Sequence, residues 1–407
     1  MRFAYVSSAY TQYVRAFYAK RPSLASAPFL IQEQALIADC FGWFGSWPDA
    51  MRPLGYEARD FIVGVAPLER AWLSENRAGR AQDVLNSAAI GVERLVQFQP
   101  EVIFFDHHDP DFLQALKERL GSIVTIGWEG SALGRQALWP HLDLVLSCAP
   151  ESVDAMRAAG ARAAHLNHAF NAPVAQRVGA RSKNGRATFI GQLTREGAFH
   201  LQREAFLEQL CSAELPLDIH SPSHDFGMRE DVKALTKMVL FVAYQSLARV
   251  PGISDNVRRL PYGYLGDKER HFPRLPVSRI LRDYLKPACF GFAMYERIAE
   301  SLVCLNIHAD SSPRFASNAR LFETTGVGTC LLTDARSNLA ELFVPGKEVV
   351  VYESAADCVE KMEWLIAHPQ EAHAIAAAGQ ARTLRDHTFA NRAEQLHAHI
   401  SHAMASR

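Results

Sequence analysis

The chain has 407 residues, of which 48% are hydrophobic and 21% are charged, and its formal net charge is −1. This length fits two domains or one large one, and the composition is that of an ordinary globular protein. A charge near zero gives no general attraction to nucleic acid or to an anionic membrane, and no apolar run is long enough to span a bilayer. The seven cysteines are dispersed without a CxxC pair, which favours a reducing, cytoplasmic setting.

The first 170 residues alternate between strand and helix patterns. Strand-like apolar runs recur through this part, and amphipathic stretches separate several of them. Alternation of this kind predicts a parallel sheet with helices on both faces. The predicted strands are 3–6, 57–63, 102–105, 123–127, 142–147 and 164–166, and the predicted helices include 81–97, 110–120 and 150–159.

Polar and aromatic residues follow three of these strands. SSAYTQY (7–13) follows the first strand, DHHDPD (106–111) follows the third, and IGWEGSAL (126–133) contains the end of the fourth. In open α/β sheets, ligands bind in the crevice outside the carboxyl ends of the strands. We therefore expect these three segments to line one binding crevice.

Three side chains in these segments are candidate catalytic groups. An imidazole takes up a proton near neutral pH, so His107 or His108 can assist deprotonation of an acceptor hydroxyl. Glu129 is a further candidate base, and Trp128 offers either a stacking surface for a sugar or a core side chain. Adjacent histidines in an extended loop point apart and no other ligand spacing accompanies them, so we predict no metal site. Histidines engaged only in local hydrogen bonds remain an alternative.

The pattern changes in the segment 167–186. Proline, glycines and four basic residues replace the apolar runs there, which predicts a linker or hinge. A strand, a helix and a strand then follow at 187–193, 196–211 and 217–220. This restart predicts a second Rossmann-like unit. The predicted division is into a first domain, a second domain and a terminal helical segment at 1–170, 187–390 and 391–407.

The segment 303–334 carries the features of an anion site. We predict a buried strand at 303–307, a polar loop, a short helix opened by Ser317, and a second strand at 330–333. A helix N-terminus beside a strand end offers unpaired backbone N–H groups and a partial positive charge. That combination favours a phosphate-bearing ligand.

Two side chains of this short helix suit a nucleotide. Arg320 and Glu323 are three residues apart and share one helix face. A guanidinium matches a diphosphate, and a carboxylate can accept hydrogen bonds from both ribose hydroxyls. The plain alternative is an exposed ion pair. Gly191, at the end of a predicted strand, would let the backbone approach a phosphate, or it forms an ordinary turn. The chain has neither a Walker loop nor a GxGxxG motif, so nucleotide binding needs another device.

The last quarter of the chain resembles bacterial glycosyltransferases of the CgeB-like, glycosyltransferase group 1 type. Four ordered blocks carry the resemblance. They are FGFAMYERIAESLVCLNIH (290–308), NARLFETTGVGTCLLTD (318–334), ELFVPGKEVVVY (341–352) and HPQEAHAIAAAGQARTLRDHTF (368–389). The resemblance implies the GT-B architecture, in which two Rossmann-like domains face each other across a cleft. It also implies that the second domain holds the nucleotide sugar and that the terminal helix crosses back to the first.

The resemblance also implies roles for single residues. Glu323 corresponds to the second glutamate of the family's Glu-x7-Glu pattern, which holds the ribose. The first glutamate falls at Phe315 and is absent, so the stereochemistry of transfer stays open. Contacts to the sugar then fall to His308, Asn318 or the loop 311–314. Gly191 joins these residues in the expected donor site.

The expected function is that of a glycosyltransferase of bacterial glycan biosynthesis. It would move a hexose-type sugar from a nucleoside diphosphate sugar, with UDP as the favoured carrier, to a glycan, protein or small-molecule acceptor. The chain has no convincing DxD motif, so we expect no metal and no cofactor. Closure of the two domains about 167–186 would exclude water. The alternatives are a sugar-nucleotide epimerase or phosphorylase of the same fold, and a non-catalytic subunit that binds sugar nucleotides.

Overall fold

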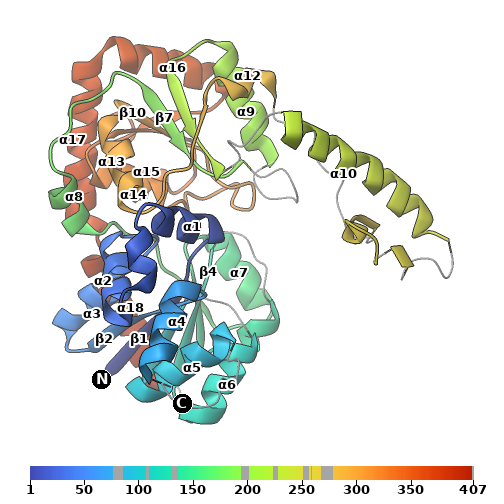
Figure 1. The fold of residues 1–407 in the computed structure, drawn as a ribbon. Coiled ribbons are helices and arrows are strands. Elements are labelled where there is room, and N and C mark those ends of the chain that lie inside the picture. The colour runs from blue at the N-terminus through green and yellow to red at the C-terminus, as the bar shows by residue number, and fades with distance from the viewer. Residues whose placement is uncertain are drawn as a thin grey trace.

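Two six-stranded parallel sheets, each flanked by helices, form the body of the protein (Figure 1). The predicted α/β class with two Rossmann-like units is confirmed. The computed structural model describes residues 1–76, 86–106, 110–130, 136–193, 201–222, 228–250, 256–257, 259–266 and 278–405.

The first sheet is built from residues up to His165. Its strands, in order across the sheet, are β2 (Glu57–Val63), β1 (Arg2–Ser8), β3 (Val102–Phe105), β4 (Val124–Glu129), β5 (Leu144–Ser147) and β6 (Ala163–His165). Its helices are α1 (Thr11–Ala19), α2 (Phe29–Ala38), α3 (Ser46–Met51), α4 (Ala66–Asn76), α5 (Ser87–Phe98), α6 (Pro110–Leu120) and α7 (Pro150–Ala158), with short 3-10 turns at Pro22–Ser26, Arg52–Leu54 and Gln136–His141.

The second sheet begins at Ala187. Its strands, in order, are β12 (Val350–Tyr352), β11 (Cys330–Asp334), β10 (Val303–Asn306), β7 (Ala187–Ile190), β8 (Leu217–His220) and β9 (Leu285–Lys286). The helices of this half are α8 (Ala172–Val178), α9 (Leu201–Ser212), α10 (Met228–Leu247), α12 (Arg279–Arg282), α13 (Phe292–Glu300), α14 (Arg320–Gly326), α15 (Leu339–Leu342), α16 (Ala355–Ala367) and α17 (Pro369–Asp386), with a 3-10 turn at Gly263–Gly266.

The central strands are buried on both faces, as parallel sheets require. Along β1, Phe3 and Tyr5 belong to one apolar cluster, whereas Ala4 and Val6 belong to another. Side chains alternate between the faces of a strand, so these two clusters lie on opposite sides of the first sheet. The continuous apolar runs that predicted the strands therefore reflect double-sided burial.

The predicted linker at 167–186 contains a helix. Pro173 stands in the first turn of α8, where a missing N–H costs nothing, and Gly179 caps its end with a φ of +63°. Val174 and Val178 are buried against the core of the second half. The proline and glycine that suggested a flexible connection are thus the two ends of a packed helical turn.

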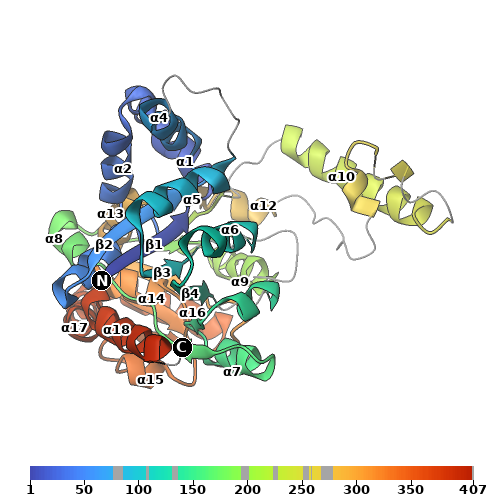
Figure 2. The same ribbon diagram turned by 90° about the horizontal axis from the view of Figure 1, so that it is seen from below.

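The chain crosses between the two halves at two adjacent places. Phe170 donates its N–H to the carbonyl of His387 (2.8 Å) and accepts from the N–H of Phe389 (3.1 Å), forming a short parallel bridge. The last helix, α18 (Phe389–Ala405), then packs against the first sheet and α3, while α17 stays with the second half (Figure 1 and Figure 2). The C-terminal helix thereby completes the core of the N-terminal half.

Helix α10 extends away from the body of the protein (Figure 1 and Figure 2). An ion pair of 2.9 Å between Arg282 and Asp231 joins its first turn to α12. One face packs on the 3-10 turn at Gly263–Gly266 through Tyr244, while Val239 is 69% exposed. The helix therefore adds little to the two cores.

All seven cysteines lie within the described residues, and none forms a disulfide. Six are buried and only Cys289 is partly exposed. No helix in the described ranges is both long enough and apolar enough to cross a membrane. Disulfide bonds therefore contribute nothing to the stability of the two halves.

One buried carboxyl group makes stability depend on pH. Burial raises the pKa of Asp60, on β2, to about 8, compared with about 3.9 in an unfolded chain. Between these values the native state keeps a proton that the unfolded state releases, so stability falls as pH rises, by up to about 1.4 kcal/mol per pH unit.

Asp60→Asn has no such proton, so its free energy of unfolding, measured with urea between about pH 5 and 8, is expected to depend less on pH than that of wild type. Glu57→Gln on the same strand, with its side chain 56% exposed, should keep the wild-type slope. Equal slopes in wild type and Asp60→Asn would contradict the assignment.

Candidate functional site

The carboxyl ends of β7 and β10 lie side by side in the second sheet. Leu305 of β10 pairs with Phe189 of β7, so the chain leaves both strands at the same edge. The guanidinium of Arg320, at the start of α14, spans this edge and donates to the carbonyl of Ile190 (3.3 Å). It also pairs with the carboxylate of Glu323 at 2.8 Å. The structure thus brings the predicted Arg–Glu pair to the end of β7, next to Gly191.

Arg320 and Glu323 are accessible but not freely exposed. Their side chains are 17% and 15% exposed. A guanidinium nitrogen of Arg320 also lies 3.1 Å from the sulfur of Met294 on α13. These contacts restrict the two side chains to one geometry, which is the arrangement expected of a preformed binding pair rather than of a mobile surface ion pair.

Helix α14 begins two residues later than predicted, since its N-cap is Ala319 rather than Ser317. Its first residue is Arg320 and its N-cap is Ala319, which already has helical dihedral angles. Ser317 does not cap the helix. Its residue is 5% exposed and its hydroxyl has no hydrogen-bond partner among the described residues. The prediction failed because a serine before an apolar run indicates a cap only when the backbone turns there.

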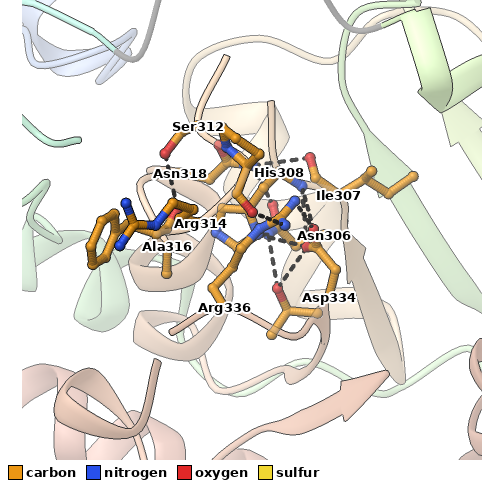
Figure 3. Close-up of polar contacts among 12 residues, drawn as sticks. Asn306, Ile307, His308, Ser312, Arg314, Ala316, Asn318, Asp334 and Arg336 are labelled. Carbon is orange, nitrogen blue, oxygen red and sulfur yellow. Dashed lines mark hydrogen bonds and ion pairs between the residues drawn. The ribbon is translucent and has the colours of Figure 1, made fainter. Parts of the chain in front are cut away.

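A network of side-chain amides fixes the loop that leads into α14 (Figure 3). The amide of Asn318 donates to Oδ1 of Asn306 (2.9 Å) and to the carbonyl of Ile307 (3.0 Å). The amide of Asn306 donates in turn to Oγ1 of Thr333 on β11 (3.0 Å). Asn318 therefore ties the loop to the end of β10, directly before Arg320.

His308 is part of a buried ion-pair chain. Its Nδ1 lies 2.6 Å from Oδ1 of Asp334, and Arg336 pairs with Oδ2 of the same carboxylate at 2.6 Å (Figure 3). Burial by itself raises the pKa of Asp334, but the hydrogen bond from His308 and the nearby positive charges more than offset this and lower it. The His308 side chain is fully buried. It supports the loop, and its burial argues against the expected contact with the sugar, which stays a prediction.

Gly191 has a packing role in the structure. Its N–H donates to the carbonyl of His220 (3.1 Å) and so continues the ladder between β7 and β8. A Cβ atom at this position would lie 2.8 Å from the ring of Phe189. The amide is therefore occupied, and the missing side chain makes room for an aromatic ring beside the proposed site.

The structure describes only some of the residues that were expected to contact the acceptor. His107 and His108 lie outside the described residues. Glu129 is the last residue of β4 and is only 5% exposed, which argues against its expected role as a base in contact with an acceptor. Trp128 packs on Trp43, with ring centroids 4.7 Å apart, and is a core side chain.

The pKa of Tyr10 is affected by charged residues from both halves of the protein. It follows β1 and packs edge-on against Phe41, with ring centroids 5.5 Å apart. Partial burial of its hydroxyl and the negative charges of Asp106 and Glu323 raise the pKa of Tyr10, although the residue as a whole is 68% exposed. Asp106 directly follows the first-half strand β3, and Glu323 belongs to α14. The hydroxyl of Tyr10 is therefore within electrostatic range of a carboxylate from each half of the protein.

Comparison with known proteins identifies the fold and a family match in the C-terminal part of the chain. Residues 255–398 match the family model described as glycosyl transferase-like. No curated protein matches the chain. A solved alpha-glucosyltransferase, bound to UDP and a 13-mer DNA with an HMU base, is similar at 10% identity over 98% of this chain and 99% of its own, with a TM-score of 0.55. The protein has the GT-B fold.

Two further structures share this GT-B fold. A glycosyltransferase from Rickettsia africae is 9% identical over 99% of this chain and 98% of its own, with a TM-score of 0.51. HepE from Anabaena, in complex with UDP-glucose, is 12% identical over 98% and 99%, with a TM-score of 0.51. At this identity the likeness establishes the fold, whereas the family match places Asn318, Arg320 and Glu323 within a glycosyl transferase-like region.

The described part of the GT-B chain offers no cluster of three or more histidine, cysteine or acidic side chains suited to a metal ion. The DHHDPD segment is only partly described, since 107–109 lie outside the described residues. The cations placed near the proposed site are instead Arg320 and Arg203, whose guanidinium donates to the carbonyl of Ile307 (2.6 Å). Burial lowers the pKa of Arg203 to about 10, so it is charged at neutral pH.

Proposed function

We propose that the protein is a glycosyltransferase that transfers a hexose-type sugar from a nucleoside diphosphate sugar to an acceptor hydroxyl. The observation that carries this proposal is the position of the Arg320–Glu323 pair. It lies at the carboxyl edge of the second sheet of a GT-B fold, inside the region that matches the glycosyl transferase-like family model. The CgeB-like resemblance of the same region agrees with it.

Arg320 and Glu323 are assigned to the two ends of the nucleoside diphosphate. Arg320 would offset the charge that develops on the leaving diphosphate, because a planar guanidinium donates two parallel hydrogen bonds to phosphate oxygens. Glu323 would accept from the ribose hydroxyls through its carboxylate. Asn318, with Gly191 beside it, would complete the wall of the donor site. UDP is the proposed carrier, as in the HepE complex.

Acceptor activation is assigned to the first half of the protein. His107 and His108 follow β3 directly, and Asp106 before them is anchored by a hydrogen bond from the Tyr5 hydroxyl (3.2 Å). A histidine there would face the donor residues from the opposite side, and the electrostatic influence of both Asp106 and Glu323 on Tyr10 supports this placement. We retain His107 or His108 as the base, whereas the burial of Glu129 makes it unsuited to contact an acceptor.

The reaction is proposed to need no metal and to take place in the cytoplasm. Arg320 supplies the positive charge at the diphosphate, and the free cysteines suit a reducing compartment. Activity is therefore expected to survive EDTA, measured as release of UDP from UDP-sugar in the presence of acceptor. Loss of activity with EDTA, restored by manganese or magnesium, would instead assign the DHHDPD segment to a metal.

The direct test of the function is a binding and turnover screen. Thermal unfolding with a panel of nucleoside diphosphates and their hexose conjugates is expected to show a raised midpoint for one base, because ligands that bind the folded state stabilise it. Incubation with that donor and an acceptor extract should release free diphosphate. Conversion of the donor without any acceptor would indicate an epimerase, and binding without turnover would indicate a non-catalytic subunit.

A further inference from the structure

A carboxylate from the first half of the protein holds a loop of the second half. Oε1 of Glu151, in the first turn of α7, accepts from the backbone N–H of Arg314 (3.0 Å) and of Phe315 (3.2 Å). Its Oε2 lies 3.2 Å from the hydroxyl of Ser312. One side chain thus forms three hydrogen bonds across the boundary, between residues more than 160 positions apart in sequence.

The same loop is anchored within the second half by separate contacts. The guanidinium of Arg336 donates to the carbonyl of Pro313 (2.5 Å). The N–H of Ala316 donates to Oδ1 of Asn338 (2.6 Å), and the N–H of Ser337 donates to the carbonyl of Arg314 (2.9 Å). Two of these bonds are accepted by carbonyls of the loop, and the third is donated by the N–H of Ala316. The N–H groups of residues 314 and 315 are the ones that Glu151 accepts from.

Glu151 is placed so that it can form these bonds as a charged group. It follows Pro150 at the N-terminus of α7, where the helix dipole favours a negative charge. Hydrogen bonds from backbone N–H groups to a carboxylate are stronger than those between neutral partners. The contact is therefore a defined clamp from α7 to the loop and not a loose surface contact.

The Ser312 hydroxyl can donate its hydrogen bond to either of two acceptors. Its oxygen lies 3.0 Å from the carbonyl of Phe315 and 3.2 Å from the Glu151 carboxylate, and its single proton serves one acceptor at a time. Ser312 is fully buried. When the two halves separate, the hydroxyl can turn to Phe315, whereas the two backbone N–H groups lose their acceptor.

We infer that Glu151 is a positioning residue that couples closure of the two halves to the shape of the donor site. The clamped residues 312–315 lie three to eleven positions before Asn318 and Glu323, and the intervening chain is held by Asn338 and Asn306. Closure would therefore set the loop from which α14 starts, and opening would release it. This inference rests on the proposed function, because only that function assigns a sugar-nucleotide donor to the site at α14.

The contact itself is tested without any ligand, by a double-mutant cycle on unfolding. Glu151→Ala, Ser312→Ala and the double variant are compared by urea unfolding with Asp154→Ala, an exposed acid on the same helix. Coupled groups give effects that do not add, so the double variant is expected to be destabilised by less than the sum of the single variants. Additive effects, or equal effects of Glu151→Ala and Asp154→Ala, would overturn the inference.

The coupling is tested with nucleotide and donor. Glu151→Ala is expected to lose about tenfold or more in kcat for transfer, because closure of the two halves no longer fixes the loop that precedes α14. Small-angle scattering should show compaction on addition of UDP-sugar in wild type and in Asp154→Ala, but less in Glu151→Ala. An unchanged kcat and an unchanged compaction would overturn the inference. If wild type binds no nucleotide, the proposed function fails, while the unfolding cycle still decides whether the clamp exists.

Discussion

Replacing Leu396 by alanine is expected to lower the free energy of unfolding of the first half by about 2–5 kcal/mol, the usual cost of removing a fully buried leucine side chain. Leu396 lies on α18 and is fully buried. It belongs to the apolar cluster that contains Phe3, Trp47 and Trp128 of the first half. Alanine is at least as good a helix former as leucine, so the loss would report packing between α18 and the first sheet.

The measurement is urea unfolding followed by tryptophan fluorescence. Trp47 and Trp128 lie in the same cluster as Leu396, so their signal is sensitive to this core. Met404→Ala on the same helix, where the side chain is 43% exposed, serves as the matched control and should change stability by no more than about 0.5 kcal/mol. Equal midpoints for Leu396→Ala and wild type would mean that α18 does not contribute to the core of the first half.

Replacing Glu323 by alanine is expected to weaken binding of the nucleotide by roughly 1.5–3 kcal/mol, the range for a hydrogen bond to a charged group. This corresponds to about 10- to 150-fold in Kd. The reason is local. The carboxylate is 15% exposed and paired with Arg320 at 2.8 Å, so its removal deletes the acceptor proposed for the ribose and also frees the guanidinium from its defined geometry.

Titration calorimetry with UDP provides the measurement, and the chain supplies a matched control. Arg297 and Glu300 form another Arg–Glu pair at the same three-residue spacing, on α13 of the same half, with side chains 42% and 34% exposed. Glu300→Ala should leave the affinity for UDP unchanged. A Glu323→Ala protein that binds every nucleoside diphosphate as tightly as wild type does would remove Glu323 from the donor site.

The strands and the Arg–Glu pair could be predicted from the sequence because both depend on local chain geometry. A run such as Val102–Phe105 is apolar at every position, which is typical of a strand buried on both faces. Arg320 and Glu323 meet because residues three apart share a helix face whatever surrounds the helix. The fold class and the main pair of the candidate site follow from such patterns.

Tertiary structure decided which polar side chains are free to act. Whether His308 faces a ligand or is buried depends on Asp334, a residue 26 positions away on the neighbouring strand. In the same way, α8 is held by the core of the second half, and its own residues, with a proline and a glycine at the ends, carry no clear helical pattern.

The contact of Glu151 with the loop 312–315 shows most clearly why the sequence alone could not predict some contacts. In the sequence Glu151 is an ordinary acidic residue in the first turn of an amphipathic helix. Its partners are backbone N–H groups more than 160 residues away, and backbone groups are the same in every residue except proline. Sequence periodicity determines which face of an element is buried, but only the packing of the two halves determines which backbone groups meet a given side chain.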